Sequence, residues 1–207
     1  YYGKDEYVGP ASFDGKWGVF DEDFMQFFCS KLSSFKQPFF SSIFTISSHN
    51  PYTVPEKYKG KFPKGKTKIL ESIAYTDYAL KQFFEAAKKE DWYKNTIFVL
   101  TADHTSSEPI LAKHKTNVGK FRIPILFFDP SNPELKGSSD KNFQQIDIMP
   151  SLVDYLNIPD NVHRAHIAIS LDFGGSESQM ISLARTYKDM GLQKKILLLI
   201  LFCFPSF

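Results

Sequence analysis

The sequence predicts an α/β fold in which helices cover both faces of a mostly parallel sheet. Short, continuously apolar runs alternate along the chain with longer segments whose apolar residues recur at helical spacing. Continuously apolar runs are typical of strands that a parallel sheet buries on both faces. At 207 residues, the chain has the length of one ordinary domain.

Helical periodicity marks three segments clearly and a fourth weakly. The first segment begins at Asp21, with acidic residues in its first turn, and ends before Pro38, which cannot continue a helix. The longest apolar stripe lies within 67–90, and a shorter helix is expected over 147–156. A weak helical pattern covers 177–188.

Strands are expected at three apolar runs, 39–47, 96–102 and 123–128, because these are rich in aromatic and β-branched residues. A further apolar run, 196–204, lies near the end of the chain. It has about half of the roughly 20 residues that a membrane-spanning helix needs. We therefore do not expect it to cross a membrane.

Composition narrows the class of function. The chain is 43% hydrophobic and 23% charged, which excludes a disordered or collagen-like protein. Twenty-five Lys and Arg against 23 Asp and Glu give a net charge of +2, too balanced for a nucleic-acid-binding surface. The two cysteines, Cys29 and Cys203, are too few and too far apart for a disulfide framework or a zinc ribbon.

The strongest chemical signal is Asp103-His104, which follows the apolar run 96–102 directly. In open α/β sheets, ligands bind at the carboxyl ends of the strands. A carboxylate and an imidazole that meet there suit a divalent metal such as zinc or manganese. The structural alternative is a capping Asp beside a solvent-facing His, because two ligands do not complete a metal site.

Two more histidines could join the same edge of the sheet. His49 follows the run 39–47, and the alternative for it is a loop histidine bonded to the backbone. His114 could enter from the next loop as a ligand or proton donor, although Lys113 and Lys115 beside it also suit an exposed basic loop.

Two other patterns carry less weight. His163 and His166 have the spacing of two metal ligands on one helical turn, but their surroundings are not helical and the further ligands that would complete a site are missing. Ser33 and Lys36 match the serine-x-x-lysine pattern of penicillin-binding enzymes without its companion motifs. We expect neither pair to be functional.

Several segments, taken in order, are similar to one known family. The chain resembles the carboxyl-terminal half of a bacterial sulfatase-type domain, in the lipoteichoic acid synthase-like branch of the alkaline phosphatase superfamily. The resemblance covers about residues 1–160 and rests on the segments 17–23, 45–51, 75–77, 102–105, 119–125 and 144–150. It implies an incomplete alkaline phosphatase-like fold.

The resemblance also implies chemistry. In this family an Asp-His pair shares a divalent metal ion with an acidic residue and a Thr nucleophile, so Asp103 and His104 are expected to be metal ligands. His49 matches a histidine that contacts the phosphate or sulfate group. His114, from its place in the loop that follows Asp103-His104 and not from the resemblance, is also expected to bind substrate. The ion could be manganese, zinc, calcium or magnesium. The substrate would be a small-molecule or lipid-linked phosphate or sulfate ester.

The family's nucleophile and its membrane helices would lie upstream of Tyr1. We therefore expect this chain to be inactive alone and to come from a protein of the bacterial cell membrane whose catalytic domain is extracytoplasmic. The alternative is a non-catalytic extracytoplasmic ligand-binding domain of the same fold. Resemblance stops near Asp160, so residues 161–207 are expected to be an atypical tail, and we hypothesise a frame-shifted or mis-joined product.

Overall fold

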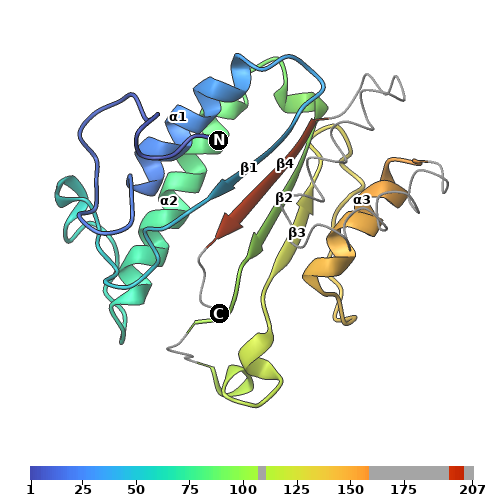
Figure 1. The fold of residues 1–207 in the computed structure, drawn as a ribbon. Coiled ribbons are helices and arrows are strands. Elements are labelled where there is room, and N and C mark those ends of the chain that lie inside the picture. Colours follow the sequence, from blue (N-terminus) through green and yellow to red (C-terminus); the bar gives the residue numbers. More distant parts are fainter. Residues whose placement is uncertain (107–110, 159–195, 203–207) are drawn as a thin grey trace.

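A computed structural model of the protein describes residues 1–106, 111–158 and 196–202. Four strands form one sheet in the order β1-β4-β2-β3. These strands are β1 (Phe40–Phe44), β4 (Ile196–Phe202), β2 (Thr96–Ala102) and β3 (Ile125–Phe128). Figure 1 shows β1, β4 and β2 side by side, with β3 at the far edge of the sheet.

The sheet is mixed but mostly parallel. Strand β4 pairs in parallel with β1 on one side and with β2 on the other, whereas β3 pairs with β2 in the antiparallel direction. The predicted fold class, a mostly parallel sheet with helices on both faces, is confirmed for the described residues. The direction of β3 was not expected.

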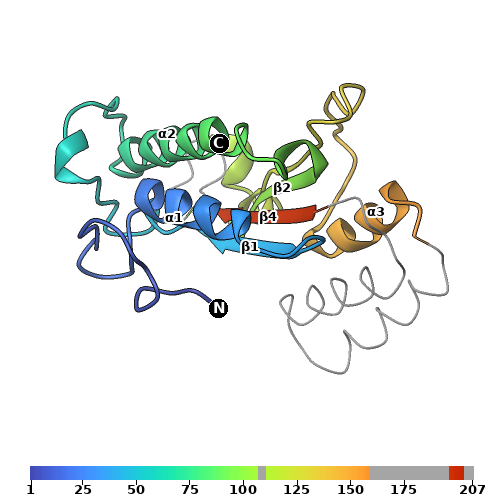
Figure 2. The ribbon, with the colours of Figure 1, turned by 90° about the horizontal axis from the view of Figure 1, so that it is seen from above.

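One face of the sheet is covered by α1 (Asp21–Ser33) and α2 (Ile69–Ala87). Figure 2 shows both helices on the same side of the strands. Their apolar stripes meet the side chains of Ile43 and Phe98 in one buried cluster, which also contains Met25, Leu32, Ala79, Phe83 and Trp92. Aromatic rings fill much of this layer, which is where the abundant phenylalanine of the sequence is used.

The opposite face is covered by the short helix α3 (Ile148–Tyr155). Its buried Leu152 and Val153 pack with Ile97 and Val99, which alternate along β2 with Phe98 on the other face. All of these β2 residues are at most 1% exposed. Strand β2 is thus buried on both faces, as its continuously apolar sequence predicted.

Within the described residues the predicted elements are present, β2 with the expected bounds and the others with shifted ends. Strand β1 is expected over 39–47 but ends at Phe44. Its continuation is diverted because the backbone N–H groups of Ile46 and Ser47 donate to the Asp21 carboxylate instead of to a neighbouring strand. Strand β3 begins directly after Pro124, which has no N–H group to donate to a ladder.

The apolar run near the end of the chain forms β4, in the middle of the sheet. Most of the predicted tail, 161–207, lies outside the described residues, and so do the weak helical pattern over 177–188 and the pair His163 and His166. The boundary near residue 160 and the frame-shift hypothesis stay predictions.

Candidate active site

The polar segments that follow β1 and β2 lie at the same end of the sheet, where these parallel strands have their carboxyl ends. Phe44 at the end of β1 and Thr101 near the end of β2 both pair with Leu201 of β4, and the three strands run in the same direction. The chain therefore leaves β1 toward His49 and leaves β2 toward Asp103 at the same edge of the sheet. With strands about 4.8 Å apart, the two exits are about 10 Å apart.

Asp103 and His104 occupy the first two positions after β2. One carboxylate oxygen of Asp103, Oδ1, accepts the backbone N–H of His104 at 2.8 Å. The ring Nδ1 of His104 lies 2.7 Å from the carbonyl oxygen of Thr105. Because a carbonyl only accepts hydrogen bonds, Nδ1 carries a proton, and in the neutral ring Nε2 keeps a lone pair.

The second carboxylate oxygen of Asp103 and the second ring nitrogen of His104 lie close together. Asp103 Oδ2 lies 3.5 Å from His104 Nε2, with the Asp side chain 30% exposed and the His side chain 64% exposed. Two ligand atoms that bind a tetrahedral ion at about 2.1 Å lie about 3.4 Å apart. This separation suits two ligands of one divalent ion, and it is also that of an ion pair between Asp103 and a protonated His104.

This pair supplies only part of a metal site. Among the described residues, no group of three or more His, Cys, Asp or Glu side chains converges closely enough to hold an ion. The capping alternative is partly realised too, since Asp103 does accept the His104 N–H. Capping occupies Oδ1 of Asp103 and leaves Oδ2 available to bind an ion, so capping and metal binding are compatible.

His49 is held on a tryptophan. The Trp17 ring centroid lies 4.3 Å from that of His49, and the Trp17 indole N–H donates to the carbonyl of Asn50 at 2.7 Å. His49 Nδ1 lies 3.0 Å from the same carbonyl. The backbone-bonded alternative is thus observed, and it has a chemical consequence: with the proton on Nδ1, Nε2 is the atom that can accept a proton or, once protonated, donate one.

His114 is not part of an exposed basic loop. It lies in the 3-10 turn η3 (Ala112–His114) and is 6% exposed, whereas Lys113 and Lys115 beside it are exposed. Neither of its ring nitrogens meets a hydrogen-bond partner among the described residues. Burial lowers the pKa of His114 below its ordinary value, and the charges of Lys113 and Arg122 lower it further, so the imidazole is neutral near pH 7.

Comparison with known proteins identifies the family. The family model described as Sulfatase matches residues 1–158, which include the strand ends and the three histidines above. The chain belongs to the sulfatase family. This confirms the resemblance seen in the sequence.

Curated relatives of this sulfatase-family chain are lipoteichoic acid synthases. It is 27% identical over 172 residues to the lipoteichoic acid synthase-like protein YvgJ of Bacillus subtilis, covering 74% of this chain and 28% of the relative. It is also 27% identical over 176 residues to lipoteichoic acid synthase 1 of the same organism, covering 74% of this chain and 27% of the relative. The chain thus spans little more than a quarter of the length of these relatives.

A solved structure supports the fold. A protein in the alkaline phosphatase superfamily from Vibrio parahaemolyticus matches with a TM-score of 0.57 and 33% sequence identity, covering 72% of this chain and 36% of the other. The expected alkaline phosphatase-like, incomplete α/β fold is therefore confirmed.

The loop that carries Asp103 and His104 in this sulfatase-family chain is fixed from two sides. The Gln145 side-chain amide, in the 3-10 turn η5 (Gln145–Asp147), donates to the carbonyl of Ala102 at 2.7 Å and approaches that of Asp103 at 3.4 Å. The Thr105 hydroxyl donates to the carbonyl of Lys120. Sequence reasoning gave Gln145 no role, although it lies in a segment that carried the family resemblance.

Two further observations concern sequence features outside this edge. The Ser33 hydroxyl donates to Glu90 at 2.6 Å and accepts the Trp92 indole N–H at 3.0 Å, which ties the end of α1 to the segment after α2. That bonding gives the serine of the serine-x-x-lysine pattern a structural role.

Within the described ranges, no helix is long and apolar enough to cross a membrane.

Proposed function

We propose that this chain is the carboxyl-terminal part of a metal-dependent enzyme that hydrolyses or transfers phosphate or sulfate esters. The observation that carries the proposal is the pair Asp103 Oδ2 and His104 Nε2, 3.5 Å apart at the carboxyl edge of the sheet in a sulfatase-family chain. Residues 1–160 would form the catalytic part, and 161–207 would be a tail of different origin.

Asp103 and His104 would hold one divalent ion. Carboxylate oxygen and imidazole nitrogen admit manganese, zinc, magnesium or calcium. A bound divalent ion would neutralise charge that develops on the phosphoryl or sulfuryl oxygens and would acidify a coordinated hydroxyl. The hydrogen bond from His104 Nδ1 to the Thr105 carbonyl would keep the ring orientation and tautomer that coordination requires.

His49 would act on the ester through Nε2. With Nδ1 engaged by the Asn50 carbonyl, the neutral ring can accept a proton at Nε2, and the protonated ring can donate there to a non-bridging oxygen or to the leaving alkoxide. His114, buried and neutral, has two ring nitrogens without partners among the described residues, and a substrate hydroxyl or phosphoryl oxygen would satisfy one of them.

The remaining machinery would come from the rest of the protein. The nucleophile and an acidic metal ligand would lie upstream of Tyr1, so the 207-residue chain alone would be inactive. The names of the relatives favour a lipid-linked phosphate ester as substrate. From the family resemblance, the whole protein would be a bacterial cell-membrane protein whose catalytic domain is extracytoplasmic. The balanced net charge of +2 speaks against nucleic acid as a partner.

The test is turnover of 4-nitrophenyl phosphate and 4-nitrophenyl sulfate by the full-length protein that contains this sequence. We expect Asp103→Asn to reduce kcat by at least about 100-fold, because one metal-binding carboxylate is lost. The matched control is Asp140→Asn, which removes an exposed carboxylate in the loop before α3 and is expected to leave kcat unchanged.

Two outcomes would overturn parts of the proposal. Wild-type turnover in the Asp103→Asn variant would remove the metal assignment. Absence of turnover for every phosphate and sulfate ester, together with retained binding of these esters, would favour the alternative of a non-catalytic extracytoplasmic ligand-binding domain.

A further inference from the structure

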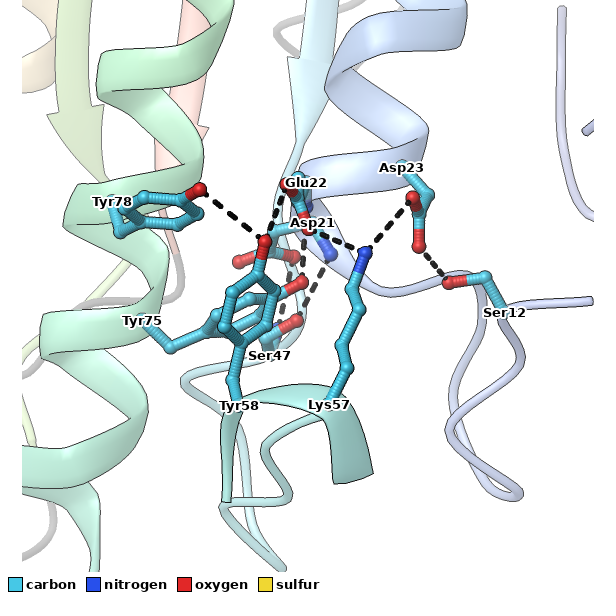
Figure 3. A network of polar contacts seen from close by, with 9 residues as sticks. All are labelled: Ser12, Asp21, Glu22, Asp23, Ser47, Lys57, Tyr58, Tyr75 and Tyr78. Carbon is cyan, nitrogen blue, oxygen red and sulfur yellow. Dashed lines mark hydrogen bonds and ion pairs between the residues drawn. The ribbon is translucent and has the colours of Figure 1, made fainter. Parts of the chain in front are cut away.

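Asp21, in the first turn of α1, has a buried carboxylate that accepts three hydrogen bonds from residues distant in the sequence. It is 2% exposed. Its Oδ1 accepts the backbone N–H groups of Ile46 at 2.9 Å and Ser47 at 3.0 Å, and its Oδ2 accepts the hydroxyl of Thr76 at 2.7 Å. Ser47 returns a bond, because its Oγ accepts the backbone N–H of Asp21 at 3.1 Å. Figure 3 shows Asp21 and Ser47 facing one another.

The residues that Asp21 holds lead directly to His49. The carbonyl of Ile46 accepts the backbone N–H of His49 at 2.9 Å, and the carbonyl of His49 accepts the N–H of Tyr52 at 2.7 Å. The turn that carries the His49 imidazole is therefore hydrogen-bonded to α1 through its first two residues, Ile46 and Ser47. Its other fastening is Trp17, whose indole N–H donates to Asn50.

The next acidic residue, Glu22, fastens a different segment. Its carboxylate accepts the hydroxyl of Tyr58 at 2.8 Å and pairs with the ammonium group of Lys57 at 2.8 Å. Figure 3 shows the Glu22 carboxylate between Tyr58 and Lys57. Asp21 and Glu22 are thus adjacent in sequence and hold separate parts of the connection from β1 to α2, of which only the part held by Asp21 carries His49.

We propose that Asp21 is a positioning residue that sets the place and tautomer of His49 in the reaction. The inference rests on the proposed function, in which His49 acts on the ester. Loss of the Asp21 carboxylate would free the N–H groups of Ile46 and Ser47 and loosen the contact between His49 Nδ1 and the Asn50 carbonyl. A misplacement of about 1 Å in a reacting group can cost about 100-fold in rate.

The test is a double-mutant cycle on turnover by the full-length protein, measured with whichever 4-nitrophenyl ester it cleaves. We expect Asp21→Ala to lower kcat by about 10- to 100-fold. In a His49→Ala background, the same change is expected to cost less than about 3-fold, since its target is already absent. Glu22→Gln, the matched control, is expected to leave kcat within about 2-fold of wild type.

Conservative variants guard against a simple loss of folding. Asp21→Asn keeps an oxygen that can accept the N–H groups of Ile46 and Ser47, so it is expected to restore most of the turnover lost in Asp21→Ala. Thr76→Val removes only the hydroxyl bond to Oδ2 and is expected to behave like wild type. A role that depends on the negative charge of Asp21 would instead make Asp21→Asn as poor as Asp21→Ala.

A readout independent of activity is ¹⁵N NMR of the histidine rings in the 207-residue chain. His49 is expected to show protonated Nδ1 and unprotonated Nε2 in the wild type, and averaged tautomers in Asp21→Ala. Equal losses from Asp21→Ala in both backgrounds, or unchanged His49 tautomers, would overturn the positioning role alone. Wild-type turnover in His49→Ala would instead overturn the proposed function of His49, and the positioning role with it.

Discussion

Replacing Leu199 by proline tests the most unexpected feature of the fold, the central position of β4. Leu199 is paired with Ser42 of β1 on one side and with Val99 of β2 on the other. Its backbone N–H therefore points into a ladder whichever neighbour it faces. Proline has no N–H, and its ring does not fit inside a central strand.

The expected cost follows from that position. Inside a helix, a proline that removes a backbone bond and clashes with its neighbours costs about 3 kcal/mol or more, and we expect a cost of the same order inside a central strand. With a urea dependence of about 2 kcal/mol per molar, the unfolding midpoint is expected to fall by about 1.5 M. This loss is a large fraction of the free energy of unfolding of a typical domain, which is about 5–15 kcal/mol and for which we take about 10 kcal/mol.

The assay is urea unfolding of the 207-residue chain, followed by circular dichroism. The matched control is Asp140→Pro in the exposed loop between β3 and α3, where a shift below about 0.3 M is expected. Equal midpoints for the two proline variants would refute the reasoning, because residues 196–202 would then not form a ladder strand. Such a result would favour the view that the end of the chain is foreign to this fold.

Three further predictions concern the described residues. Phe98→Ala, at a 0% exposed ring whose centroid lies 5.1 Å from that of Phe84, is expected to cost about 3–5 kcal/mol in thermal unfolding; a loss below about 1 kcal/mol would contradict the packing. Burial and the charge of Glu90 raise the pKa of the Cys29 thiol to about 11. In a Cys203→Ser variant, Cys29 is therefore expected to react with a disulfide reagent at pH 8 at least about 100-fold more slowly than in urea, and equal rates would contradict its burial. The pKa of His114 is lowered by burial, so the unfolded chain binds the proton first as pH falls. The free energy of unfolding is expected to drop between about pH 7 and 5, and His114→Gln is expected to weaken this drop; an unchanged pH profile would contradict it.

Local sequence pattern was sufficient for the elements but not for their pairing. The run 96–102 became β2 with the expected bounds, because a continuously apolar strand has one stable place, between two covered faces. The direction of β3 and the insertion of β4 between β1 and β2 depend on contacts between distant segments. A strand's own sequence looks the same in either direction and beside either neighbour, so these features were not predictable from it.

For the candidate site too, the residues were predictable from the sequence, but their orientations and partners were not. Strand ends pointed to Asp103, His104 and His49, because the carboxyl edge of a parallel sheet is where polar side chains can meet a ligand. The ring orientations were not predictable, since they depend on backbone carbonyls and on partners such as Trp17, which is remote in sequence from His49. Acidic residues at the start of α1 were visible in the sequence, but the dipole of the helix was sufficient reason for them.

His114 illustrates how a local pattern can mislead. Two flanking lysines suggested an exposed loop, yet the 3-10 turn directs both lysines outward and the imidazole inward. Burial of one ring between exposed charges is a consequence of backbone geometry, which composition does not record. The structure therefore rules out the exposed-loop alternative for His114.

Metal content is the measurement that tests the central claim most directly. The full-length protein would be purified without chelator, and its manganese, zinc, magnesium and calcium would be quantified by mass spectrometry beside the Asp103→Asn and Asp140→Asn variants. We expect about one tightly held divalent ion in the wild type and in Asp140→Asn, and its loss in Asp103→Asn. Equal metal content in all three proteins would contradict the assignment of Asp103 and His104 as the ligands.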